Sequence, residues 1–403
     1  MSAVVGTLAA LSVGAAPSAV AADTQSKQWY LEPMQAEKMW KVSTGEGVKI
    51  AVIDSGVNAN TPSLKGQVLV DEVPKAVNYA ATDDYSGHGT TMAELIAGTG
   101  AEDGIQGLAP GAKIVPYRVQ LEGLKAGLEK EKTPQSWEAL RAAADTDAKI
   151  ISMSFGGMST EEGRAAIKYA ASRGKLLVAA VGNDGYAALP AAYPYVVGVA
   201  AANSSLEVSD FSATGYADLA APGEAIPTWC DETFRSYCED NGTSQATALA
   251  SAAAALIWSA HPDWTVNQVT RALIDTAGRT WPKDEPSKYA GYGFIRPRVV
   301  LENPNYDAGA ANVDPLAKVN RGDLLAKSAE KSDKTSPSPS PSASAPAPSQ
   351  AQEEASTGGT SAAGSSAATS DDSNTVWITL GAAAAVIVVG GVGAAVVRAR
   401  RAR

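Results

Sequence analysis

Histidine is scarce in this chain, since only His88 and His261 occur among its 403 residues. The sequence also lacks the His-Glu-x-x-His pattern through which many hydrolases bind zinc. Too few imidazoles are present for a zinc ligand set, so a metallohydrolase is disfavoured. His261 precedes a predicted helix that has Thr265 as its N-cap and Gln268 three residues later, and we therefore assign it to a loop.

Positive charge is also scarce relative to negative charge. The chain has 33 Lys and Arg residues against 43 Asp and Glu residues, which gives a formal net charge of −10. Because binding to phosphates depends on clustered Lys and Arg, we expect no nucleic-acid partner.

Only two cysteines occur, Cys230 and Cys238, and both lie in one polar, loop-like stretch. In an oxidising compartment they would close a small ring as a disulfide. Loop-closure entropy makes such a bridge worth roughly 2.5 kcal/mol. The alternative is two unrelated thiols.

The N-terminal residues are typical of a targeting segment. Residues 1–22 are rich in Ala, Val and Leu and end in small residues before the polar Asp23. We expect a signal peptide that is cleaved after Ala21 or Ala22, followed by an N-terminal extension over 23–45.

The C-terminal residues indicate a membrane anchor. A Ser-, Pro- and Ala-rich stretch over 306–375 predicts a disordered linker, because it cannot bury enough apolar surface to fold. Residues 376–397 are apolar and long enough to span about 30 Å as one transmembrane helix. The Arg-rich tail at 398–403 favours a cytoplasmic C-terminus and therefore an extracellular folded domain, in a single-pass protein of the cell membrane. A buried soluble helix is the weaker alternative, since the linker offers no core.

Between these ends, residues 46–305 are predicted to form the folded domain. Short β-rich runs at 48–53, 149–154 and 175–180 alternate with helical runs. This alternation predicts an α/β fold, with a mostly parallel sheet and helices on both faces. Function in such sheets gathers at the carboxyl ends of the strands.

Two helices of this domain carry recognisable start signals. Thr133 is the expected N-cap of one helix, with Pro134 at its first position. Ser159 and Glu162 predict a capping box for a second helix, which ends at Gly174.

Three short motifs carry groups suited to nucleophilic catalysis. Asp54 follows the first strand, His88 lies between two glycines at the head of a helix, and Ser244 precedes an Ala-rich helix. Asn183, just past a buried strand, has an amide that can donate to an oxyanion. Taken singly, each has a structural alternative: Asp54 as a turn former, His88 as a structural histidine, Ser244 as a helix N-cap.

The chain order Asp, His, Ser is that of subtilisin. The motifs Asp54-Ser55-Gly56, Gly87-His88-Gly89-Thr90, Ser154-Phe155-Gly156-Gly157, Gly182-Asn183 and Gly242-Thr243-Ser244 resemble those of the subtilisin-like serine peptidases. The resemblance covers roughly residues 45–280. It implies a three-layer subtilisin-like fold and a serine endopeptidase acting on proteins or peptides.

The resemblance also implies individual roles. His88 would be the general base for the nucleophile Ser244, and Asp54 would hold the imidazole tautomer. Asn183 and the Ser244 backbone N–H would form the oxyanion hole. The walls of the primary specificity pocket would be formed by Ser154, Phe155, Gly156, Ala180, Val181 and Gly182.

Some features of the family are not placed by this sequence or differ in it. Structural calcium is common in the family, yet its ligands cannot be located here; no other cofactor and no catalytic metal are expected. Gln245 and Ala248 stand where the family usually has a hydrophobic residue and a proline. We therefore expect the start of the nucleophile helix to pack differently.

The overall layout is similar to that of the mycosins, the membrane-anchored peptidases associated with type VII secretion. That similarity implies secretion machinery as a partner and secreted proteins as substrates. A catalytically silent subtilisin-like domain that serves as a scaffold in a secretion complex is the alternative from another functional class.

Overall fold

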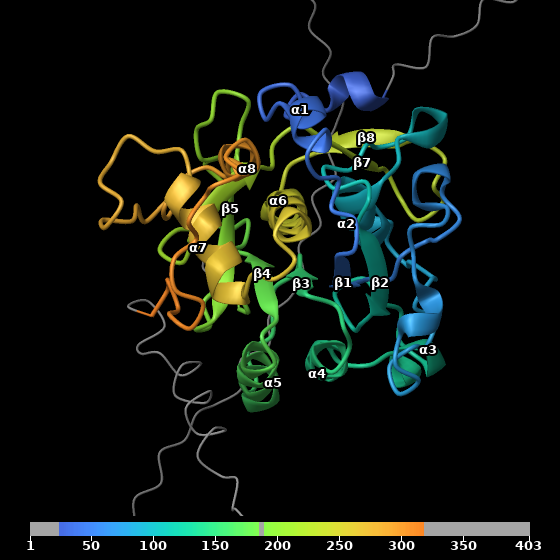
Figure 1. Ribbon diagram of the computed structural model, residues 1–403. Coiled ribbons are helices and arrows are strands. Elements are labelled where there is room, and N and C mark those ends of the chain that lie inside the picture. Colours follow the sequence, from blue (N-terminus) through green and yellow to red (C-terminus); the bar gives the residue numbers. More distant parts are fainter. Residues whose placement is uncertain (1–23, 185–188, 318–403) are drawn as a thin grey trace, which may run out of the picture. The chain divides into compact units, whose positions relative to one another are not determined.

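A parallel sheet forms the centre of the molecule. The computed structural model describes residues 24–184 and 189–317, and in them six strands pair in the order β2-β1-β3-β4-β5-β6, all parallel (Figure 1). Their side chains are almost entirely buried, which explains their continuous apolar sequences. The strands are β1 (Lys49–Asp54), β2 (Lys113–Arg118), β3 (Ile150–Met153), β4 (Leu176–Ala180), β5 (Val196–Ala202) and β6 (Leu219–Pro222).

Helices cover both faces of the sheet, as predicted. One core cluster joins the sheet to α2 (His88–Ala97) and α6 (Thr243–Ala260), and a second joins it to α4 (Ser136–Ala144) and α5 (Glu161–Ser172). In Figure 1, α4 and α5 lie together on the side opposite α6. The three-layer α/β architecture expected from the sequence is therefore confirmed.

The structure corrects the predicted start of α4. Its N-cap is Gln135, whose side chain forms a capping box with Glu138. Thr133 instead follows the short helix α3 (Leu128–Lys132), where its hydroxyl donates to the Glu129 carbonyl at 2.8 Å. The Thr133 side chain is therefore bonded to the end of α3 and does not cap α4, and Pro134 lies before the first residue of α4.

The start of α5 is displaced by one residue from the prediction. Thr160, and not Ser159, is the N-cap, and its hydroxyl accepts from Gly163 N at 3.1 Å. The end is as expected, since Arg173 is the C-cap and Gly174 has φ 72°, a conformation that favours glycine.

The N-terminal extension is part of this folded unit. Tyr30 and Met39 are fully buried in the core cluster that contains α6, and the Ser43 hydroxyl donates to the Leu256 carbonyl at 2.8 Å. The other helices are η1 (Thr24–Lys27), α1 (Ala36–Trp40), η2 (Pro62–Leu64), η3 (Val70–Glu72), η4 (Ala101–Asp103), α3 (Leu128–Lys132), α7 (Val266–Thr276) and α8 (Pro297–Leu301).

The folded region continues beyond the boundary expected at 305. Arg271 of α7 donates to the backbone carbonyls of Ala308, Ala310 and Val313, and Leu316 is buried. Residues 306–317 therefore belong to the domain and not to the linker, because this arginine satisfies their carbonyl groups.

The predicted signal peptide and transmembrane helix, at 1–22 and 376–397, lie outside the described residues. Within 24–184 and 189–317, none of the helices combines the length and apolarity that crossing a membrane requires.

Candidate active site

An aspartate and a histidine meet at the carboxyl edge of the sheet. Asp54, the last residue of β1, is fully buried, and its Oδ1 lies 2.7 Å from Nδ1 of His88, the first residue of α2. Ser55 donates its N–H to the same oxygen at 2.8 Å, and its hydroxyl oxygen lies 3.1 Å from that oxygen. A Cβ on Gly89 would lie 2.1 Å from the Gly56 carbonyl oxygen, so glycine is required for this close approach.

The Asp54 carboxylate also controls the charge of His88. Burial by itself lowers the pKa of His88, but the adjacent Asp54, with smaller contributions from Asp84 and Asp240, raises it to about 9. The imidazole side chain is 36% exposed. The ring can therefore be reached from solvent. Because its pKa is raised, it is neutral, and able to accept a proton, chiefly at alkaline pH.

Ser244 lies in the first turn of α6. Its hydroxyl donates to the Ser154 carbonyl at 3.0 Å, and the Ser154 hydroxyl donates back to the Ser244 carbonyl at 3.0 Å. Asn183 uses its side-chain oxygen to accept from Thr243 N and Oγ1, each at 2.9 Å. The Asn183 amide nitrogen is consequently the group that can donate to a ligand, beside the positive end of the helix dipole.

One cavity of about 650 Å³ brings these groups together. Val181 is the exception among the predicted wall residues, because its side chain is fully buried and packs against Gly198 on β5. Successive side chains of an extended segment point to opposite sides. Ala180 and Gly182 line the cavity, so the Val181 side chain between them points into the core. The predicted residues that do line the cavity are Asp54, His88, Ser154, Phe155, Gly156, Ala180, Gly182, Asn183 and Ser244.

The match to a known family agrees with this geometry. Residues 45–293 match the subtilase family, peptidase S8. The chain belongs to this family. Thermitase of Thermoactinomyces vulgaris is 34% identical over 286 residues, which cover 66% of this chain and 95% of thermitase. Subtilisin E of Bacillus subtilis is 36% identical over 245 residues, which cover 58% of this chain and 61% of subtilisin E.

Solved structures point in the same direction. The serine protease MycP1, described as an essential component of the type VII (ESX-1) secretion system, superposes with a TM-score of 0.57 and 27% identity. The superposition covers 70% of this chain and 90% of that structure. These relatives make the present subtilase a serine endopeptidase of the subtilisin type, with mycosins among its structural neighbours.

Sequence reasoning missed Asp84 of this subtilase. Its buried carboxylate accepts five hydrogen bonds, and three of the donors are backbone N–H groups of the segment that carries His88. A carboxylate followed at once by a Tyr-Ser-Gly turn was the available signal, because Asp often caps such turns. The donors are Ser55 Oγ (2.7 Å), Ser86 N (3.0 Å), Gly87 N (3.0 Å), Thr90 N (2.8 Å) and Thr90 Oγ1 (2.6 Å).

The first turn of α6 contains a buried side-chain amide. Gln245 is 2% exposed, and its Oε1 has no hydrogen-bond partner among the described residues. A Cβ on Gly242 would lie 2.4 Å from that oxygen, so the side chain folds back beneath the turn before Ser244.

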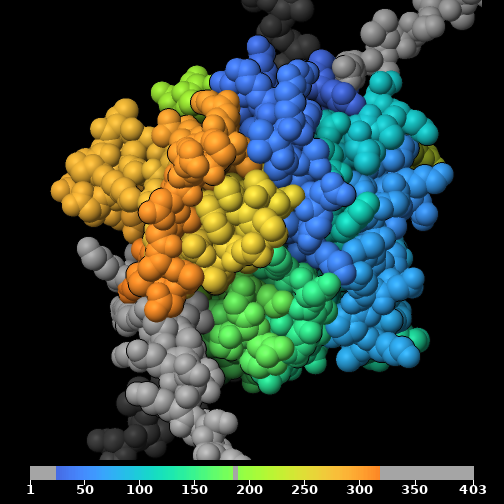
Figure 2. All heavy atoms as spheres, viewed as in Figure 1, coloured from blue at the N-terminus to red at the C-terminus, as the bar shows by residue number. Residues whose placement is uncertain are grey.

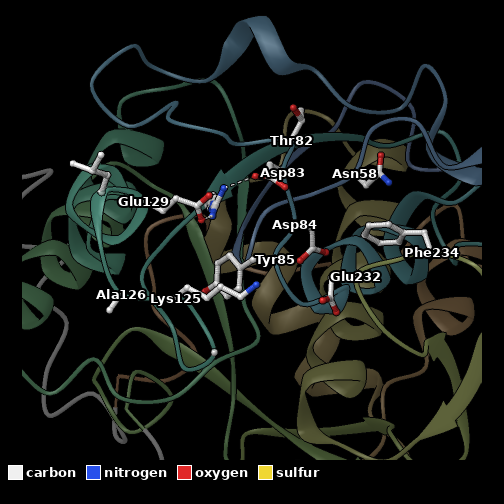
Figure 3. A pocket seen from close by; sticks show the side chains of 13 residues that line it. Asn58, Thr82, Asp83, Asp84, Tyr85, Lys125, Ala126, Glu129, Glu232 and Phe234 are labelled. Atoms are coloured by element: carbon white, nitrogen blue, oxygen red, sulfur yellow. Dashed lines mark hydrogen bonds and ion pairs between the residues drawn. The ribbon is translucent and has the colours of Figure 1, made fainter.

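A second cavity of about 690 Å³ lies nearby and is strongly charged (Figure 3). Arg118, which is fully buried, forms ion pairs with Asp83 at 2.9 Å and Glu129 at 3.1 Å on its wall. Its opposite wall includes Glu232 and Phe234 from the loop closed by the predicted disulfide, Cys230–Cys238, which the structure contains. Within the described part of the chain, no group of three or more His, Cys, Asp or Glu side chains is arranged to hold a metal ion.

Proposed function

We propose that this subtilase hydrolyses peptide bonds through a triad of Asp54, His88 and Ser244. The observation that carries the proposal is the 2.7 Å contact between Asp54 and His88, in a cavity that also contains Ser244 and Asn183. A buried carboxylate, an exposed imidazole and a hydroxyl at a helix N-terminus are the groups that acyl transfer needs.

The proposed mechanism assigns one task to each group. Neutral His88 takes the proton from Ser244 Oγ while that oxygen attacks the scissile carbonyl, and then gives the proton to the leaving amine. Because the hydroxyl now donates to Ser154, it must turn toward His88 for this step. The Asn183 amide and the Ser244 N–H stabilise the oxyanion. Water, activated by His88, then hydrolyses the acyl-enzyme.

The proposed location is the outer face of the cell membrane. The apolar segments at 1–22 and 376–397 and the terminal arginines support a secreted domain with a C-terminal anchor. The likeness to MycP1 supports a role beside a secretion system, with secreted proteins as substrates.

The test uses the full-length protein in membranes and a fluorophosphonate probe, which captures an activated serine covalently. Wild type should label and cleave peptides at pH 9, where His88 is substantially neutral, and Ser244→Ala should do neither. Ser259→Ala, at the far end of the same helix, is the control and should behave as wild type. Lack of labelling in folded wild type would favour the scaffold role, and protection of the domain from external protease in intact cells would contradict the location.

A further inference from the structure

The hairpin of β7 (Ile226–Trp229) and β8 (Tyr237–Asp240) packs against the helix that begins with His88. Trp229 N donates to Thr91 Oγ1 at 3.0 Å, and that hydroxyl donates to the Gly87 carbonyl at 2.9 Å. A hydrogen-bonded chain thus leads from the hairpin backbone to the residue immediately before His88.

A buried carboxylate makes a second attachment. Glu94 is fully buried one turn beyond Thr91, on the same face of α2. It accepts from the Tyr237 hydroxyl at 3.0 Å and from Thr61 Oγ1 at 2.7 Å. The Tyr237 ring stacks on Trp229 at 3.9 Å between ring centroids, so the two attachments to α2 are held by one aromatic pair.

A third contact is made by the loop between the strands. A Cβ on Gly87 would lie 2.8 Å from the Asp231 carbonyl oxygen, and Gly87 has φ 80°. The backbone of the loop at Asp231 is therefore in close contact with Gly87, the N-cap of α2. The Cys230–Cys238 disulfide closes this loop at its base, next to the Trp229–Tyr237 pair in the hairpin register.

We propose that the disulfide-closed hairpin β7–β8 positions His88 through Gly87, Thr91 and Glu94. The inference rests on the proposed role of His88 as the base. His88 is the first residue of α2 and its ring is partly exposed, so its place beside Asp54 depends on how firmly the first turns of α2 are held. A displacement of a catalytic group by about 1 Å reduces the rate by up to about a hundredfold.

The test compares wild type with the paired substitution Cys230→Ser and Cys238→Ser, and separately with Tyr237→Phe. The second variant keeps the stacked ring but removes the hydroxyl that donates to Glu94. Tyr289→Phe, at a half-exposed tyrosine, is the matched control. For a small peptide substrate we expect kcat to fall about tenfold or more in both hairpin variants, with KM within about twofold.

The pH profile provides a readout that a merely structural role would not move. Where α2 shifts and His88 draws away from Asp54, the acid limb of kcat/KM should move to lower pH, because the carboxylate no longer favours the imidazolium. Unchanged kcat and an unchanged acid limb in folded Tyr237→Phe would overturn the inference, as would a rise in KM alone, which would make the hairpin a substrate wall. Should the cysteine pair fail to fold, Tyr237→Phe decides. An inactive wild type would refute the proposed function, and the inference with it.

Discussion

The buried Glu94 should make the protein less stable as pH rises from acid to neutral. Burial raises the pKa of Glu94, and the hydrogen bonds from Thr61 and Tyr237 lower it by a smaller amount. The net result is a rise from 4.5 to about 7. One pKa unit corresponds to about 1.4 kcal/mol, so ionisation of Glu94 costs about 3 kcal/mol more in the folded than in the unfolded protein. A raised carboxyl pKa means that full stability is present below pH 4.5 and is lost progressively up to about pH 7.

The substitution Glu94→Gln removes that titration with little change of shape. Near pH 4 the variant and wild type should have similar free energies of unfolding, and at pH 8 the variant should be more stable by up to about 3 kcal/mol. Burial also raises the pKa of Asp218 to about 7, so wild type alone would not isolate Glu94. The difference between the two proteins does.

The assay is urea unfolding followed by tryptophan fluorescence from pH 4 to 8. Every protein carries Ser244→Ala, so that self-cleavage does not contribute. Glu162→Gln, at an exposed glutamate of α5, serves as the matched control and should track its parent at every pH. A stability difference between Glu94→Gln and its parent that stays constant across this range would refute the reasoning.

Two further predictions concern charge and cross-linking. Asp240→Asn should move the acid limb of kcat/KM to lower pH by less than about one unit, because Asp240 helps to raise the pKa of His88 and exposed charges are screened. A pH–rate profile checks this, with the exposed Asp284→Asn as control; an upward shift would contradict it. Replacing both Cys230 and Cys238 by serine should lower the free energy of unfolding by roughly 2.5 kcal/mol, as measured by denaturation in urea, and equal midpoints would count against the loop-closure estimate.

Much of this site could be predicted because its determinants are local in sequence. Asp54, His88 and Ser244 each follow or precede a buried element whose apolar pattern is plain, and their order is specific. The hidden contacts are long-range ones. Glu94 looks like a solvent-facing residue until Tyr237, 143 positions away, is seen to donate to it.

The predicted end of the folded domain at residue 305 and two predicted helix N-caps differ from the structure for a related reason. Arg271 binds carbonyls about 40 residues further along the chain, and no periodicity of 306–317 reveals that docking. Cap positions moved by one or two residues where several polar side chains competed for the same N–H groups, as Ser159 and Thr160 do.

The helix that carries Ser244 lies at the centre of the molecule. α6 is buried along most of its length and packs against five strands of the sheet as well as α2, α7 and α8. A partly unfolded molecule cannot keep Ser244 in place, because the sheet and the helices on that face of it pack against the same helix. We therefore expect each partly unfolded molecule to lose all of its activity, and not to become a slower or less selective protease. The residual activity of a partly denatured sample should then be proportional to the fraction of molecules that is still folded.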